Sequence, residues 1–375
     1  MSSRASLARS YPTGPGPATI GPMDRKLAWV GLNLLPSLTP RRRELLLRRC
    51  GGPAEACEAL ARGLPEDLRA EIGDKVSSEL ATADPEQEIL LAGRAGAEIL
   101  TLDDPGYPAP LREIPIPPPV LYVRGGWKPE DACAVAIVGT RRCTSYGRVV
   151  AKKLAAQLAG RGVTVVSGLA PGIDAAAHEG ALSVGRTIAV LGSGLGKPYP
   201  AGREPLIAEI AKRGAVMSEF PWEMPGSQWT FPRRNRIIAG LARAVVVVEA
   251  PERSGALITV DHALAQGKEV LAVPGPITSE ASRGSNRLLQ DGAKPVLSAD
   301  DVLAELGMPS LPLPAAPTLP PEAQSVYGLL SQEPLDPSEI VARTGLPHPQ
   351  VSQILLDLVL AGRVQELPGR KYVRA

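Results

Sequence analysis

Six short segments of the sequence combine small residues, cations and aromatic rings in a way that suits the binding of an anionic polymer. Each follows a short apolar run, and together they cover residues 139–147, 167–174, 192–200, 219–236, 253–255 and 282–287. Small residues at the start of a helix expose backbone N–H groups, and the helix dipole favours an anion there. The chemistry that these segments could perform is therefore the binding of phosphate groups.

Aromatic rings extend this chemistry from phosphates to bases. Only 3% of the chain is aromatic, yet six of its aromatic residues lie in these segments: Tyr146, Tyr199, Phe220, Trp222, Trp229 and Phe231. In a single strand, the phosphates can meet cations and helix ends while the unstacked bases meet the rings. A duplex would hide its bases from such rings. The pattern therefore favours single-stranded nucleic acid.

The elements that must position these segments form a parallel sheet. Apolar, β-branched runs lie at residues 134–139, 163–168, 187–192, 215–220, 244–250 and 269–275, with helical patterns between them. Continuous apolar strands that alternate with helices are typical of a sheet covered on both faces. We therefore predict an α/β fold, a doubly wound Rossmann-like parallel sheet of about six strands. Because the carboxyl ends of parallel strands meet at one edge, the segments should share one surface.

The flanking sequence predicts two smaller domains. Residues 24–90 have the pattern of short helices broken by proline and glycine, and an extra strand is expected at 120–123. Near the C-terminus, three helical patterns and a hairpin around Pro368-Gly369 are typical of a winged helix. The predicted division is a disordered leader at 1–22, a helical domain at 23–92, an extended Rossmann-like domain at 93–301, a linker at 302–320 and a winged-helix domain at 321–375.

Composition narrows the class of protein. The 375-residue chain has a net charge of +2, but residues 130–300 hold 20 basic and 15 acidic side chains, so an anionic partner should bind there. No apolar run reaches the roughly 20 residues of a membrane-spanning helix, and residues 1–22 lack the apolar core of a secretory signal. The four cysteines and three histidines are scattered, which predicts no metal site, no disulfide framework and no cofactor. We expect a soluble, cytoplasmic protein without a membrane partner.

Two enzyme classes could use the same loops. Residues 192–196 carry three alternate glycines after a strand, and Glu219 ends the next strand about 20 residues later, as in a dinucleotide-binding fingerprint. However, Pro198 and Pro200 disfavour the helix that nicotinamide or flavin binding needs at this point. The other alternative is a nucleotide-binding Rossmann-like enzyme of the phosphoribohydrolase type. Such enzymes share a Pro-Gly-Gly-x-Gly-Thr-x-x-Glu segment, and residues 253–259 here lack its acid.

The order of the motifs resembles one family in particular. The chain carries Gly139-Thr140-Arg141, Ser167-Gly168-Leu169, Gly172-Ile173-Asp174, the run from Phe231 to Leu241, the run from Ser254 to Thr259, and Ala272-Val273-Pro274-Gly275. These motifs look like those of the DNA-processing protein A family (DprA, also called Smf). The resemblance covers roughly residues 100–300, and the flanking domains are similar to those of family members with three modules.

The resemblance implies a dimeric single-stranded DNA-binding protein without enzymatic activity. Such a protein protects incoming strands during natural transformation and loads the RecA recombinase onto them, and its homodimer forms through the Rossmann-like domain. By motif match, Arg141 and Lys197 would contact phosphate, and residues 231–236 would line the same pocket. The candidate DNA-binding residues are Gly139, Thr140, Arg141, Arg142, Ser167, Gly168, Lys197, Arg203, Phe231, Arg233, Arg234, Asn235, Arg236, Ser254, Gly255 and Asn286. A structural partner of another DNA-binding protein is a third possibility.

Some positions depart from the family pattern. Pro171 stands where a basic residue is usual, and Arg203, where asparagine is common, could supply a charge in its place. The N-terminal domain lacks the glycines of the usual helical hairpin, so we expect it to serve folding or protein contacts.

In the winged helix, the expected recognition helix at 348–358 has no lysine or arginine. Because a duplex reader needs a basic face there, we expect a protein-contact role over duplex recognition.

Overall fold

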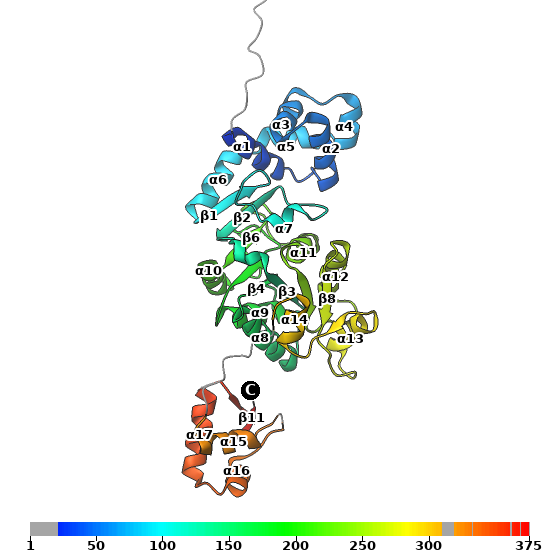
Figure 1. The fold of residues 1–375 in the computed structure, drawn as a ribbon. Coiled ribbons are helices and arrows are strands. Elements are labelled where there is room, and N and C mark those ends of the chain that lie inside the picture. The colour runs from blue at the N-terminus through cyan, green and yellow to red at the C-terminus, as the bar shows by residue number, and fades with distance from the viewer. Residues whose placement is uncertain (1–21, 310–318, 332, 361, 368, 375) are drawn as a thin grey trace, which may run out of the picture. The chain divides into compact units, whose positions relative to one another are not determined.

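The computed structural model describes residues 22–309, 319–331, 333–360, 362–367 and 369–374 (Figure 1). The chain forms two compact units, Met1–Pro309 and Ser310–Ala375. The predicted leader, apart from Pro22, and residues 310–318 of the predicted linker lie outside the described residues. Within the described ranges, no helix combines the length and the apolar character that crossing a membrane requires.

The first unit is built on a nine-stranded sheet in the order β1-β2-β6-β5-β4-β3-β7-β8-β9. All six apolar runs form parallel strands: β3 (Ala134–Val138), β4 (Thr164–Ser167), β5 (Thr187–Val190), β6 (Ala215–Ser218), β7 (Ala244–Val247) and β8 (Glu269–Ala272). A short β9 (Lys294–Pro295) extends the parallel part, while β1 (Ala97–Thr101) and β2 (Val120–Gly125) add an antiparallel pair at the other edge. The predicted fold class is confirmed, with a sheet larger than expected.

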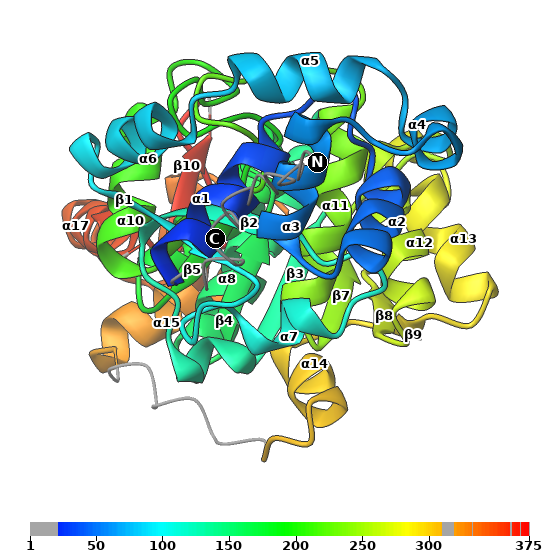
Figure 2. The same ribbon diagram turned by 90° about the horizontal axis from the view of Figure 1, so that it is seen from above.

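Helices cover both faces of this sheet, as Figure 2 shows for α10 and α11 on opposite sides. One layer contains α8 (Ser145–Ala159), α9 (Ile173–Leu182), α10 (Glu204–Arg213) and α14 (Ala299–Glu305). The other contains α7 (Ala109–Arg112), α11 (Thr230–Leu241) and α12 (Gly255–Ala265), and the remaining elements are α13 (Arg283–Gln290), η1 (Pro129–Ala132) and η2 (Glu280–Ser282). Both faces need this cover because the side chains of each strand alternate between them. In β3, Val135 and Ile137 pack in the first layer, while Ala136 packs in the second.

The N-terminal helices form a small module that rests on the antiparallel strands. It consists of α1 (Pro22–Asn33), α2 (Pro40–Cys50), α3 (Pro53–Arg62), α4 (Glu66–Ile72), α5 (Lys75–Thr82) and α6 (Pro85–Arg94). Trp29 of α1 and Tyr122 of β2 pack with Trp222, which is 7% exposed. The sequence leaves open whether Trp222 faces the ligand edge or packs in a core, and the structure places this ring in the core at the junction between the module and the sheet.

The second unit contains three helices and a hairpin, as the sequence predicts. They are α15 (Pro321–Leu329), α16 (Pro337–Thr344), α17 (His348–Leu360), β10 (Val364–Leu367) and β11 (Lys371–Arg374). Val326, Ile340 and Val351 form part of a separate apolar core. On α17, the exposed side chains include Ser352, Gln353, Leu356 and Asp357, none of them a cation.

Candidate nucleic-acid interface

A cleft of about 850 Å³ opens where the winding of the sheet reverses direction. The chain winds away from β3 through β4, β5 and β6, and then returns to place β7 on the other side of β3. The loop after β3 leads to α8 on one face, and the loop after β7 leads to α12 on the other. This divergence at the carboxyl ends of adjacent strands is where ligands bind in open α/β sheets.

The cleft gathers many of the candidate residues from the loop after β3, from helix α11 and from the loop between β7 and α12. Those that line it are Gly139, Thr140, Arg141, Arg142, Phe231, Arg234, Asn235, Ser254 and Gly255. The lining also contains Tyr199, Gln228 and Arg253, which were not in the candidate set. Arg253 could have been found from its place directly before Ser254, at the end of the loop after β7. The residues that line the cleft thus come from the segments after β3, β4, β5, β7 and β8, and from α11 and the residues before it.

One wall of the cleft is a stack of a cation on two rings. The guanidinium of Arg141 lies 5.1 Å from the centroid of the Phe231 ring, and the Tyr199 ring lies 5.1 Å from Phe231 on an inclined plane. Tyr199 is 45% exposed, so its ring remains accessible. A Cβ on Gly192 would lie 2.5 Å from Phe231, so a glycine is required for this loop to pass so close to the ring. The wall offers a positive charge beside an open aromatic surface.

The N-terminus of α8 is closed by a carboxylate of the chain itself. Glu249, which is buried, accepts hydrogen bonds from the backbone N–H and the hydroxyl of Thr144, at 2.9 and 2.6 Å. A Cβ on Gly147 would overlap the Glu249 carboxylate. The N-terminus of α8 can therefore approach this carboxylate only because residue 147 is glycine. Because the carboxylate occupies it, the N-terminus of α8 is less available to an external anion. The dinucleotide alternative concerns residues 192–196, and the helix that follows them, α10, begins only at Glu204.

The N-termini of two other helices at the cleft, α9 and α12, differ in whether the first turn carries a carboxylate. Asp174, in the first turn of α9, accepts hydrogen bonds from the backbone N–H groups of Gly168 and Ala170. The first turn of α12 carries no acid, and its cap, Ser254, accepts a hydrogen bond from the N–H of Ala256. The position of a Cβ on Gly255 faces open space. The N-terminus of α12 is therefore the better place for an anion in this cleft.

Arg234 forms the floor of the cleft. It is only 4% exposed, and its guanidinium donates hydrogen bonds to the carbonyl oxygens of Gly168 and Val190, at the ends of β4 and β5. Burial lowers the pKa of Arg234 to about 10, against the attraction of Asp174. Behind it, the hydroxyl of Ser167 donates to the carbonyl of Ile137. Ser167 and Gly168 thus support the floor and do not line the cleft.

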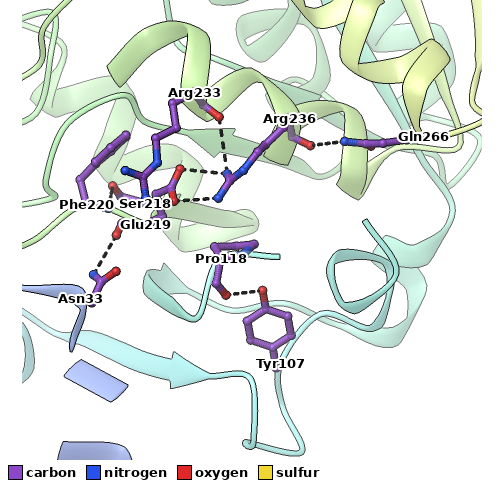
Figure 3. A network of polar contacts seen from close by, with 9 residues as sticks. All are labelled: Asn33, Tyr107, Pro118, Ser218, Glu219, Phe220, Arg233, Arg236 and Gln266. Carbon is purple, nitrogen blue, oxygen red and sulfur yellow. Dashed lines mark hydrogen bonds and ion pairs between the residues drawn. The ribbon is translucent and has the colours of Figure 1, made fainter. Parts of the chain in front are cut away.

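Arg233 and Arg236, which flank Arg234 in the sequence, both project toward Glu219 (Figure 3). Arg236 makes a two-pronged contact with buried Glu219, with N–O distances of 2.9 and 2.8 Å, and Arg233 reaches the same carboxylate at 2.9 Å. The side-chain amide of Asn33, in the N-terminal module, donates to the backbone oxygen of Glu219. The spacing of 233 and 236, three residues apart on a helix, already puts them on a different face from 234.

The remaining candidates also lie outside the cleft lining. Lys197 is exposed and its Nζ lies 3.2 Å from a carboxylate oxygen of Glu223, while Arg203 directly precedes α10. The amide of Asn286 bonds both the N–H and the carbonyl of Gly275, so it fixes the loop after β8. Phe220 is buried and was expected at this edge in error, because Trp229 and Arg233 cover its ring.

Comparison with known proteins decides the family. A family model described as DNA recombination-mediator protein A matches residues 98–307, and one described as DprA winged helix domain matches residues 310–370. This chain belongs to the DprA/Smf family. The resemblance noted in the sequence is thereby confirmed, together with the winged-helix assignment.

Relatives of this DprA-family chain cover most of its length. The Smf protein of Synechocystis sp. is 36% identical over 84% of this chain and 89% of its own. The putative DNA processing protein DprA of Mycobacterium tuberculosis is 40% identical over 86% of this chain and 88% of its own. The X-ray structure of DprA from Streptococcus pneumoniae has a TM-score of 0.63 and 34% identity, and the match covers 75% of this chain and 97% of that one. A structure described for the single-stranded DNA binding mode of Helicobacter pylori DprA has a TM-score of 0.51 and 31% identity, over 56% and 95%.

A buried carboxyl gives this DprA-family protein a testable pH dependence. Burial raises the pKa of Asp174 to about 6, whereas it lowers the pKa of His178 to about 3. Folded protein therefore holds the Asp174 proton more tightly than the unfolded chain, so this group stabilises the fold below pH 4 and loses that effect as the pH rises through 6. His178 acts in the opposite direction over an overlapping range, so the wild type alone will not separate them.

We expect the Asp174→Asn variant to isolate this effect. Relative to the variant, the free energy of unfolding of the wild type should fall by up to about 3 kcal/mol between pH 4 and 7. The measurement is urea denaturation of both proteins at several pH values. Parallel curves for the two proteins across this range would show that Asp174 keeps an ordinary pKa.

Proposed function

We propose that this protein binds single-stranded DNA in the cleft between β3 and β7, protects incoming strands and loads RecA onto them. The observation that carries the proposal is the composition of the cleft. The Arg141–Phe231–Tyr199 wall lies in the same cleft as the acid-free N-terminus of α12. Phosphates would bind the cations and the backbone N–H groups of α12, while a base would stack on the exposed ring of Tyr199.

The proposed contacts form a core set and an outer set. The core set is the group of candidates that line the cleft, together with Arg253. Lys197 and Arg203 would contact the strand outside the cleft. Arg233, Arg236, Ser167, Gly168 and Asn286 would contribute by holding the surrounding segments in place, since each is engaged with another part of the chain.

The wider role rests on the family. The Helicobacter pylori DprA structure is described for its single-stranded DNA binding mode, and the relatives from Bacillus subtilis and Streptococcus pneumoniae are named DNA processing proteins. By this kinship we propose natural transformation as the process, RecA as the partner, a homodimer through the Rossmann-like domain and a cytoplasmic location. No cofactor and no catalytic step enter the proposal.

The experiment that tests the proposal is a titration without any partner protein. A labelled single strand and the matching duplex are titrated side by side while the salt concentration is varied. We expect tighter binding of the single strand, with a log–log salt slope of about −0.7 for each phosphate neutralised. Equal or tighter binding of the duplex would contradict the proposal, and absence of binding to either would leave only a role through another DNA-binding protein.

A nucleotide-cleaving enzyme is the second candidate, favoured by a cleft large enough for a nucleotide. Among the described lining residues, the acids are Asp174 and Glu280. Asp174 is occupied by backbone N–H groups, which leaves it poorly placed to act on a substrate. Incubation with nucleoside monophosphates should release no free base, and release at a useful rate would favour the enzyme.

The winged helix is expected to bind protein in preference to duplex DNA. The exposed face of α17 carries no cation in the described residues, so it offers little to offset phosphate charge. This unit has its own apolar core, so it can be produced separately as residues 317–375. We expect the isolated segment to show only weak duplex binding at physiological salt in a gel-shift titration. Tight binding there would assign duplex recognition to this unit.

A further inference from the structure

Helix α8, whose N-terminus lies beside the cleft, carries basic side chains and no acidic ones. Helix α8 follows the loop that contains Arg141 and Arg142, and its sequence SYGRVVAKKLAAQLA contains Arg148, Lys152 and Lys153 but no acid. All three cations are exposed. The surface that begins at the cleft thus continues along α8 with positive charge.

The pairing of the α8 cations can be compared with that of cations on other helices. Several of those form an ion pair with an acid three or four residues away: Arg48 with Glu44, Arg62 with Glu58, Lys212 with Glu209 and Arg287 with Asp291. In the same described residues, Arg148, Lys152 and Lys153 have no ion pair, and neither do Arg141 and Arg142. Within those ranges Glu179, the exposed acid of the neighbouring helix α9, forms no ion pair with them. This stretch of charge is free to meet an external anion.

The geometry of α8 arranges these groups as a track. Ala151, Leu154, Ala155 and Leu158 are buried against the sheet, which leaves one arc of the helix exposed. On that arc, Arg148 and Lys152 lie one turn apart. Tyr146, Val149 and Lys153, at spacings of three and four residues, follow one another along a neighbouring stripe. Tyr146 and Val149 are 45% and 50% exposed, and the Tyr146 hydroxyl donates to the carbonyl of Pro274. From Ser145 to Lys153 the arc runs for about 12 Å.

We propose that α8 is a second binding surface for the DNA strand, which leaves the cleft past Arg142 and runs along this helix. The inference rests on the proposed function of the cleft and extends its length. Arg148, Lys152 and Lys153 bind phosphates, while the exposed parts of Tyr146 and Val149 contact sugars or bases. Because the charged contacts are with phosphates and contacts of bases with apolar side chains tolerate any sequence, this surface carries no base preference. An acidic protein is a weaker fit, since the same positive surface continues into the cleft, which offers rings for bases.

The test compares two strand lengths on the variant Arg148→Ala/Lys152→Ala/Lys153→Ala. The probes are labelled oligothymidylates of about 4 and about 16 nucleotides, the range of site sizes for single-strand-binding domains. For the long probe we expect affinity to fall on the order of 100-fold at about 0.1 M salt, with a salt slope smaller in magnitude by about 2. For the short probe, which the cleft can hold alone, affinity should change less than about 3-fold, since distant charges are screened at this ionic strength.

A matched control removes the same charge from the opposite edge of the sheet. Arg124, Lys128 and Lys212 are exposed near the amino ends of the strands, and their replacement by alanine should leave the binding of both probes unchanged. Alanine favours helix, so the α8 variant should keep its thermal midpoint. An α8 variant that binds the long probe as well as wild type, or loses both probes equally, overturns the proposal. Failure of the cleft itself is distinguishable, because the wild type would then bind neither probe.

Discussion

The Glu219→Ala variant is expected to lose about 3–5 kcal/mol of the free energy of unfolding. Glu219 is buried and holds both Arg236, whose side chain is 7% exposed, and Arg233. Arg43 of the N-terminal module is also buried, which lowers its pKa to about 10, and the attraction of Glu219 opposes that shift. Removing one acid would leave this group of cations without compensation in a place that water scarcely reaches. Urea denaturation at neutral pH measures the loss.

An exposed acid from the same region provides the control for this prediction. Glu223 follows Glu219 by four residues, but its ion pair with Lys197 is 56% exposed on both sides. Glu223→Ala should therefore cost less than about 1 kcal/mol. If the two variants had equal free energies of unfolding, the buried pairs of Glu219 with Arg233 and Arg236 would stabilise the fold no more than the exposed pair of Glu223 with Lys197.

The Arg141→Ala variant is expected to weaken single-stranded DNA binding on the order of 10- to 30-fold. In the proposed complex this arginine contacts a phosphate, and its guanidinium also lies on the Phe231 ring, so its loss removes charge and disturbs the stacking wall. The salt slope should decrease in magnitude by about 0.7. Fluorescence anisotropy with a labelled oligonucleotide at several salt concentrations measures both quantities.

Lys197→Ala serves as the comparison within the same assay. Its slope should change by a similar amount if Lys197 contacts a phosphate, but its affinity should fall less, because its ammonium is exposed and already shared with Glu223. An unchanged slope in either variant would remove that residue from the set of phosphate contacts. A larger loss for Lys197 than for Arg141 would move the centre of binding out of the cleft.

The sheet could be predicted from sequence because its central strands are continuous apolar runs. Each is buried on both faces, so pattern alone separates it from the amphipathic helices. The strand β9 consists of Lys294 and Pro295, both exposed, and gives no such signal. The antiparallel β1 was also missed, because its five residues include the exposed Glu98 and directly follow a helix.

The site was predictable at the level of loops but less so at the level of side chains. Parallel topology brings the loops after β3 and β7 together whatever their sequences, so the place of the cleft follows from the fold. The sequence does not show that Arg234 points to the cleft while Arg233 and Arg236 point to Glu219, because that depends on how α11 is turned against the sheet. The burial of Phe220 and Trp222 depends likewise on the N-terminal module and its neighbours, which no local pattern records.

Amide hydrogen exchange with and without a single-stranded oligonucleotide tests most directly where the strand binds. We expect slower exchange at residues 139–144, 228–235 and 251–259, the segments that form the cleft. Exchange at the amino edge of the sheet, around Lys128 and Lys212, should not change. Protection confined to the winged helix or the N-terminal module, with the cleft segments unaltered, would contradict binding in the cleft.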